Sequence, residues 1–107
     1  MINKEIKTKA QASKVATEFA NDLWWKVSIF DGYKVEKEND GEEYRVVLTS
    51  SNSCAILTMS CMEYFLEVIN AYLVVYRRDI TWHINAFKNA DGHEYPAIVV
   101  CFRKSNI

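Results

Sequence analysis

The fold is decided by residues 59–78, MSCMEYFLEVINAYLVVYRR. Apolar side chains recur there every three or four residues, which is the period of an α-helix. These recurring positions are Met62, Phe65, Leu66, Ile69, Tyr72, Leu73 and Tyr76. The apolar arc is wider than a helix with one solvent-exposed face needs, because it also includes Tyr64, Val68, Ala71 and Val75. We therefore expect a central helix that is buried against a sheet on one side and largely covered on another.

Both ends of this central helix carry sequence signals. Ser60 and Glu63 have the spacing of a capping box, in which each side chain satisfies a free backbone amide of the first turn. Arg77 and Arg78 follow the last turn, where the helix dipole favours cations. In the alternative interpretation, residues 72–76 form a strand because they are rich in Val and Tyr.

The overall composition is that of one soluble globular domain spanning residues 1–107. Half of the residues are hydrophobic and a quarter are charged, which is ordinary for such a domain. The net charge of −1 gives no electrostatic reason to expect binding to nucleic acid or to an anionic membrane. No apolar run reaches the 18 residues that a membrane-spanning helix needs.

The cysteine pattern predicts reduced thiols in a cytoplasmic protein. The three cysteines, Cys54, Cys61 and Cys101, are an odd number and include no CxxC pair. Residues 1–11 are polar and charged, without the apolar segment of a signal peptide.

A second helix is expected from about residue 8 to about residue 30. Its apolar positions again follow the three-four spacing, and Thr8 with Gln11 could form a capping box at its start. Gly32 can take the left-handed conformation at no steric cost, which suits the residue after a helix. The apolar stripe consists of Ala12, Val15, Ala16, Phe19, Ala20, Leu23, Trp24 and Val27.

The remaining segments alternate between apolar and polar residues, which predicts strands. Asp40-Gly41 and Asp91-Gly92 have the sequence of two-residue hairpin turns. Pro96 indicates an edge position or a strand start, because proline cannot donate to the ladder. The expected strands cover residues 33–38, 44–50, 54–58, 80–86 and 97–103. The predicted class is α+β, with two helices on an antiparallel sheet of about five strands in the order α-β-β-β-α-β-β.

In element order alone, the chain resembles the small acidic homodimeric chaperones of bacterial secreted effectors. The resemblance covers most of the chain, but no motif carries it and the final helix of those proteins is missing here. It implies an interaction partner that is another protein, by analogy of fold.

No catalytic or metal site is predicted. Cys61 would lie in the first turn of the central helix, where the dipole favours a thiolate, and a nucleophile there would need His83 or His93 as its base. A buried core thiol is the plainer interpretation of Cys61. No cysteine or histidine pair has the spacing of a structural zinc site, and no motif indicates a cofactor.

Two charged groups have both a plain and a functional interpretation. The acidic residues 36–43 could attract a cation or a basic partner, although such a run is usually a solvated hairpin that protects a sheet edge. A basic group lies near Trp82, Phe87 and Phe102, and cations beside aromatic rings can bind nucleic acid. It consists of Arg77, Arg78, Lys88, Arg103 and Lys104. Alternation places Trp82 inward, against that function.

The leading hypothesis is a non-enzymatic adaptor or chaperone-like module that binds another protein or a second copy of itself. This hypothesis is based on the wide apolar arc of the central helix, which exceeds what the rest of the chain is expected to cover. The predicted interface residues are Trp25, Tyr64, Val68 and Val75. We expect Val68→Lys to weaken such association at little cost in folding stability. The alternatives are a small cysteine-dependent enzyme using Cys61 and a nucleic-acid-binding domain using the basic group.

Overall fold

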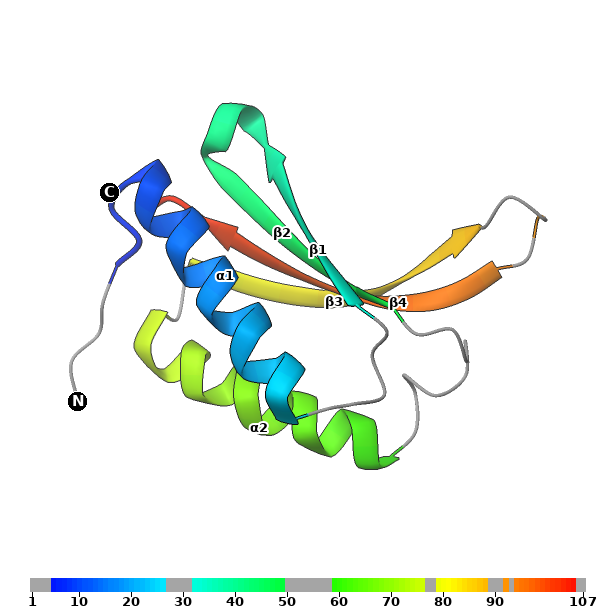
Figure 1. Cartoon of the computed structure of the whole chain (residues 1–107). Helices are drawn as coiled ribbons and strands as arrows, with labels where there is room; N and C mark the ends of the chain where they lie inside the picture. Colours follow the sequence, from blue (N-terminus) through cyan, green and yellow to red (C-terminus); the bar gives the residue numbers. More distant parts are fainter. Residues whose placement is uncertain are drawn as a thin grey trace.

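The computed structural model describes residues 5–26, 32–49, 59–76, 79–88, 92 and 94–105. Two helices pack on one antiparallel sheet, which confirms the α+β class (Figure 1). The elements are α1 (Lys9–Lys26), β1 (Gly32–Glu38), the short 3₁₀ turn η1 (Asn39–Gly41), β2 (Glu43–Thr49), α2 (Met59–Tyr76), β3 (Ile80–Lys88) and β4 (Glu94–Arg103).

The sheet has the strand order β1-β2-β4-β3. The described order of elements is α-β-β-α-β-β, whereas five strands were expected from the sequence. The additional strand was predicted at residues 54–58, which lie outside the described residues. The alternative strand at residues 72–76 is wrong, because α2 continues to Tyr76.

Both helices cover the same face of the sheet. α1 contacts β1, β2 and β4, while α2 contacts α1 and β3. Phe19 of α1 lies 5.5 Å from Phe102 of β4, and Phe65 of α2 lies 4.9 Å from Trp82 of β3, measured between ring centroids. Since Phe102 and Trp82 have the same orientation in the β3–β4 register, the core is a single layer between the helices and the sheet.

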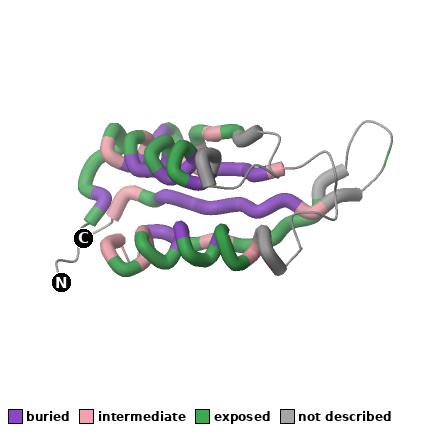
Figure 2. Tube along the Cα trace, turned by 60° about the horizontal axis from the view of Figure 1, so that its bottom comes forward, coloured by how far each residue is buried: buried purple, intermediate pink, exposed green. Residues whose placement is uncertain are grey.

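The long strand β4 lies in the middle of this core. Figure 2 shows it as an almost unbroken buried strand, and every residue from Ala97 to Phe102 is buried. A central strand is covered by neighbours on both edges, which explains its near-continuous apolar sequence. The opposite face of the sheet, which carries no described helix, has its own small cluster of Val47, Ala97, Val99 and Cys101.

Pro96 lies near the start of β4, not at a sheet edge. Of the two positions that the sequence allowed, the strand start is therefore correct. Lys104 donates its amide to the Glu42 carbonyl at 2.7 Å, so alternation directs the even-numbered residues of β4 toward β2. Among the described residues the β2 pairing begins at Ile98, so the missing proline amide removes no bond from the described part of that ladder.

The capping box at the start of α1 is confirmed, with one change. The backbone amide of Gln11 donates to Thr8 Oγ1 at 3.1 Å, as the capping box requires. The Gln11 side chain accepts from the Lys7 amide at 3.0 Å instead of from the Thr8 amide. The helix ends at Lys26 in the structure, and residues 27–30, which the predicted helix included, lie outside the described part.

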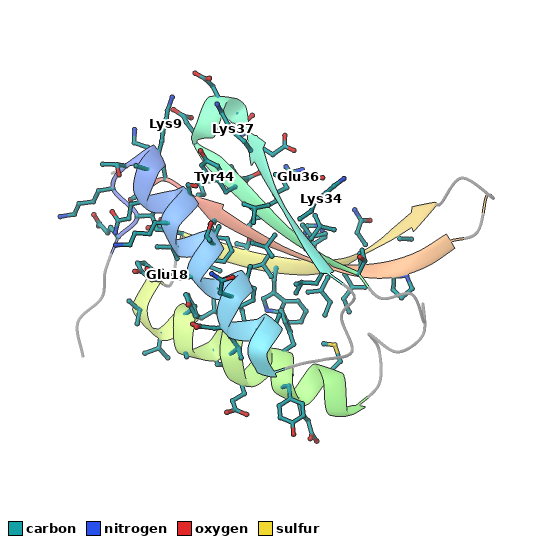
Figure 3. All side chains as sticks on the ribbon, viewed as in Figure 1. Lys9, Glu18, Lys34, Glu36, Lys37 and Tyr44 are labelled. Atoms are coloured by element: carbon teal, nitrogen blue, oxygen red, sulfur yellow. The ribbon has the colours of Figure 1, made fainter. Side chains whose placement is uncertain are left out.

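The turn at Asp40-Gly41 is present but longer than the predicted two residues. Glu38 pairs with Glu43, so residues 39–42 connect the strands. Asn39, Asp40 and Gly41 all have positive φ, which Asn, Asp and Gly tolerate best. A Cβ at Gly41 would lie 3.4 Å from Lys9 Cδ, and Lys9 lies beside this turn in Figure 3.

The segment before α1 is fastened to the far end of the sheet. The Ile6 amide donates to Asp79 Oδ2 at 2.9 Å, and the Ser105 amide donates to the Ile6 carbonyl at 2.7 Å. Ile6 is fully buried and Asp79 nearly so. A buried carboxylate needs such a partner, so the bond from the Ile6 amide accounts for Asp79 as a structural residue.

Candidate interaction surfaces

The four predicted interface residues have different positions in the structure. Tyr64 is 50% exposed, and Val75 is partly buried. Val68 is only 5% exposed and belongs to the main core. Trp25 lies in the last turn of α1, and its side chain is outside the described part. Because Val68 is buried, we revise the expectation that Val68→Lys costs little stability.

The solvent-facing side of α2 nevertheless carries large apolar side chains. Tyr64 is 50%, Leu66 37% and Val74 43% exposed, and we call these three residues the outer face of α2. The sequence periodicity places Leu66 in the buried stripe and does not single out Val74. Helical geometry could have identified Val74, because it lies close in angle to Glu63, Glu67 and Asn70.

The inner side of α2 is anchored by aromatic contacts with α1. The Tyr72 hydroxyl donates to Asp22 Oδ2 at 2.5 Å, and its ring lies 5.4 Å from that of Phe19. Burial, followed by the hydrogen bond to the Asp22 carboxylate, raises the pKa of Tyr72 well above its usual value. Burial raises the pKa of Tyr76 as well. The outer face therefore belongs to a helix whose opposite side packs against α1.

His83 does not face α2. In the β3–β4 register it pairs with Val99, whose side chain lies in the cluster on the helix-free face of the sheet. α2, which contains Cys61, packs against the other face. The Cys61 side chain and His93 lie outside the described part, so the nucleophile hypothesis keeps only His93 as its base.

No group of three potential metal ligands occurs among the described residues. Cys101 is buried on the helix-free face, and burial raises the pKa of its thiol, with the Glu43 carboxylate adding to the effect. A raised pKa keeps the neutral thiol, which is a poor nucleophile and a poor metal ligand.

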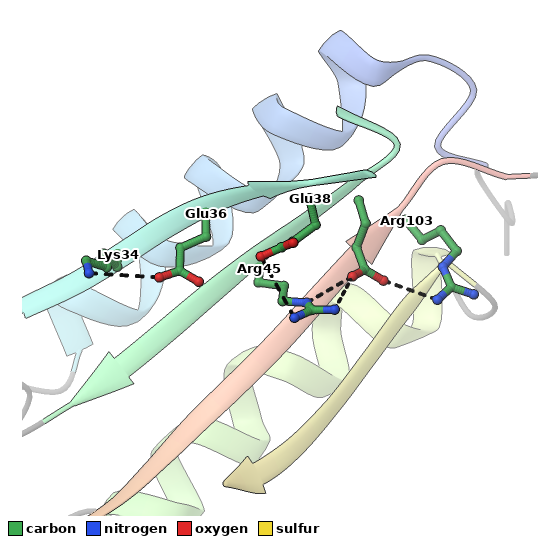
Figure 4. A network of polar contacts seen from close by, with 6 residues as sticks. Lys34, Glu36, Glu38, Arg45 and Arg103 are labelled. Atoms are coloured by element: carbon green, nitrogen blue, oxygen red, sulfur yellow. Dashed lines mark hydrogen bonds and ion pairs between the residues drawn. The ribbon is translucent and has the colours of Figure 1, made fainter. Parts of the chain in front are cut away.

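A compact charge cluster lies at one end of the helix-free face (Figure 4). Glu43, with a side chain only 4% exposed, accepts from Arg45 Nε at 2.9 Å and from an Arg103 terminal nitrogen at 3.2 Å. The hydrogen bond to Glu43 raises the pKa of Arg45. Arg45 also lies 3.9 Å from Glu38 of β1. The buried carboxylate thus joins β2 to β4, and Arg45 extends this structural ion-pair network to β1.

The predicted acidic and basic groups are partly accounted for by this cluster and its neighbours. Glu38 and Glu43 pair with Arg45, and Asp40 lies 3.5 Å from Lys9 Nζ. Among the basic residues, Arg103 pairs with Glu43, whereas Arg77 and Arg78 lie outside the described part. Trp82 points inward against Phe65, as alternation predicted. That ring is therefore not placed to stack on a base.

No helix among the described residues is long and apolar enough to cross a membrane. Comparison of the chain with protein families, with curated proteins and with solved structures finds no match. A function for this chain is therefore inferred from the surfaces described above.

Proposed function

We propose that the protein is a non-enzymatic protein-binding module and that the outer face of α2 is its contact surface. The observation that carries this proposal is the exposure of three large apolar side chains, Tyr64, Leu66 and Val74, on one helix. Large apolar and aromatic side chains supply most of the binding free energy at protein interfaces. The proposed partner is another protein or a second copy of the chain, in the cytoplasm.

The buried side of α2 holds the outer face in a fixed position, which suits a binding surface. Phe65, Val68 and Ile69 of the same helix are buried in the core. The backbone of α2 is therefore held in place before any partner arrives, and little ordering entropy is lost on binding. Glu63 and Asn70 are exposed between the apolar side chains and can set the orientation of a partner.

The two alternative functions gain less from the structure. A cysteine-dependent enzyme would use Cys61, but His83 faces away from α2. A nucleic-acid-binding domain would use the basic group, but Trp82 is packed on Phe65 and Arg103 is paired with Glu43. Each of these observations removes a residue that the alternative needs.

The test is a photocrosslinking experiment in cells that produce the protein. A photoreactive phenylalanine analogue replaces Tyr64 in one variant and Lys14 in the control. Lys14 is exposed on α1, so it reports accidental encounters with the same reagent. We expect discrete covalent adducts at position 64 that are absent at position 14, and mass spectrometry identifies the captured protein. Equal labelling at both positions, or no adduct at position 64, would refute the proposal.

A further inference from the structure

β3 is an edge strand of the sheet with a free outer side among the described residues. Its only described strand partner is β4, in one continuous register from Ile80–Phe102 to Lys88–Glu94. The sequence from Ile80 to Phe87, ITWHINAF, contains no Asp, Glu, Lys, Arg or Pro. Edge strands normally avoid pairing with other chains through charges, prolines, bulges or short length. β3 has none of these protections over that span.

The hydrogen-bonding groups on this free edge follow from the ladder geometry. The Arg103 amide donates to the Asp79 carbonyl at 2.8 Å, so the pair of residues 79 and 103 is of the hydrogen-bonded type. In an antiparallel ladder this type alternates with the non-bonded type. Odd-numbered residues of β3 therefore bond to β4. The amide and carbonyl groups that point outward belong to Ile80, Trp82, Ile84, Ala86 and Lys88.

We infer that β3 pairs with β3 of a second copy, antiparallel and centred on Ile84. Ile84 is the middle residue of the strand and one of those whose backbone groups point outward. A twofold axis there makes Ile84 face Ile84 of the second copy in a hydrogen-bonded pair. Each such pair exchanges two hydrogen bonds, so the five facing pairs give about ten bonds. The two sheets then form one continuous sheet through an isologous interface.

The side chains are compatible with this register. Ile84 is 45% exposed on the helix side of the sheet, and pairing would place it against its own symmetry mate. Trp82 would face Ala86 on the same side, and His83 would face Asn85 on the other. No pair in this register places two like charges opposite each other, since Lys88 faces Ile80.

Self-complementarity selects a second copy over an unrelated extended peptide. The outward backbone groups are arranged symmetrically about the middle of β3, so one strand satisfies the other over its full length. The free edge also has an exposed apolar residue, Ile84, at the centre of symmetry, where it would face its own copy. This interface uses a strand edge and does not depend on the outer face of α2, so it does not rest on the proposed protein-binding function.

Disulfide trapping tests the register directly. In Ile84→Cys, two facing Cα atoms would lie about 5.5 Å apart, within disulfide range. In Thr81→Cys, residue 81 faces residue 87, so the two introduced cysteines would be about 20 Å apart. We expect mild oxidation to give an intermolecular 84–84 disulfide, identified by peptide mass spectrometry, and no 81–81 disulfide. Equal trapping at both positions would overturn the proposed register.

Sedimentation equilibrium tests the interface without a covalent bond. We expect the unmodified chain to form dimers, and Ile84→Lys to raise the dimer dissociation constant at least about tenfold, because two lysines would face each other across the axis. Thr81→Lys adds the same charge to the same strand opposite a neutral residue and should leave the dimer intact. Circular dichroism confirms that both variants are folded. A monomeric unmodified chain, a peptide-bound monomer, or a dimer insensitive to Ile84→Lys would overturn the inference, while the crosslinking at position 64 would still decide the proposed function separately.

Discussion

The two edge strands of the sheet, β1 and β3, each pair antiparallel with one inner strand but present different surfaces. β1, GYKVEKE, carries four charged residues, and three of them make ion pairs: Lys34 Nζ lies 3.9 Å from Glu36, and Glu38 lies 3.9 Å from Arg45 of β2. β3 has no charged residue before Lys88. Charged side chains must be desolvated when another strand pairs beside them, which makes pairing at β1 unfavourable.

Among the described residues, charged side chains therefore protect the β1 edge, whereas the β3 edge has no such protection before Lys88. Both edges are near the helices, because α1 contacts β1 and α2 contacts β3. The layer of helices therefore does not explain the difference, since helices cover a face of the sheet and not its hydrogen-bonding edge. The charge pattern does, and three sets of substitutions test this explanation.

The largest loss of folding stability is expected in α2, the helix that packs against β3. Val68→Lys places a charge at a side chain that is 5% exposed in the core, and we expect a loss of several kcal/mol in the free energy of unfolding, about 3 kcal/mol or more. Val74→Lys makes the same change on the same helix at a side chain that is 43% exposed. It should change stability by less than about 0.5 kcal/mol.

Urea denaturation measures both variants, and hydrogen exchange shows which strand is released. We expect the amides of β3 to lose protection first in Val68→Lys, while those of β1 are still held by α1. Equal costs for Val68→Lys and Val74→Lys would mean that Val68 is not part of the core that supports β3.

An intermediate effect is expected for the charge cluster that joins β1 to the centre of the sheet. Glu43→Gln removes the carboxylate that binds Arg45 and Arg103, and we expect a cost of about 1–3 kcal/mol in urea denaturation. Lys34→Gln breaks an ion pair on β1 whose side chains are 77% and 42% exposed to solvent, so its cost should stay within about 0.5 kcal/mol. A similar cost for both would show that burial of Glu43 does not strengthen its ion pairs.

The smallest effect on stability is expected at the β1 edge. The same change tests the difference between the β1 and β3 edges most directly. Replacing Lys34 and Glu36 together by threonine keeps the net charge, and threonine favours strands. The free energy of unfolding should change by about 0.5 kcal/mol or less. The new edge resembles β3, so a dimer with two open edges should continue to grow. Light scattering should show larger assemblies; an unchanged particle size would mean that these charges do not protect β1.

Much of the fold could be predicted because its signals are local. Helix period, the Thr8–Gln11 cap and the turn at Asp40-Gly41 depend on neighbours within a few residues, and all three are present. The length of that turn was wrong because three successive residues adopt positive φ, which the pair Asp-Gly alone does not indicate. The Ile6–Asp79 bond joins residues 73 apart and had no local signal.

The candidate surfaces were predicted only in part. The wide apolar arc of α2 indicated surplus apolar surface, and Tyr64 is indeed exposed. Val68 and Val74 are the same residue type on the same helix, and which of them is buried depends on where α1 and the sheet lie around that helix. The sequence periodicity counts apolar positions but does not show which part of a wide arc meets a neighbour.

Side-chain periodicity was enough to predict two amphipathic helices and alternating strands in one α+β unit, because it sets which faces can be buried. The tertiary structure was needed to show that β4 is central and β3 is an edge, since strand order results from long-range pairing that no local pattern encodes. It also decided the meaning of the uncharged run in β3. Within a sheet such a strand would be ordinary core, whereas at an edge its outward amides and carbonyls are open to a second chain.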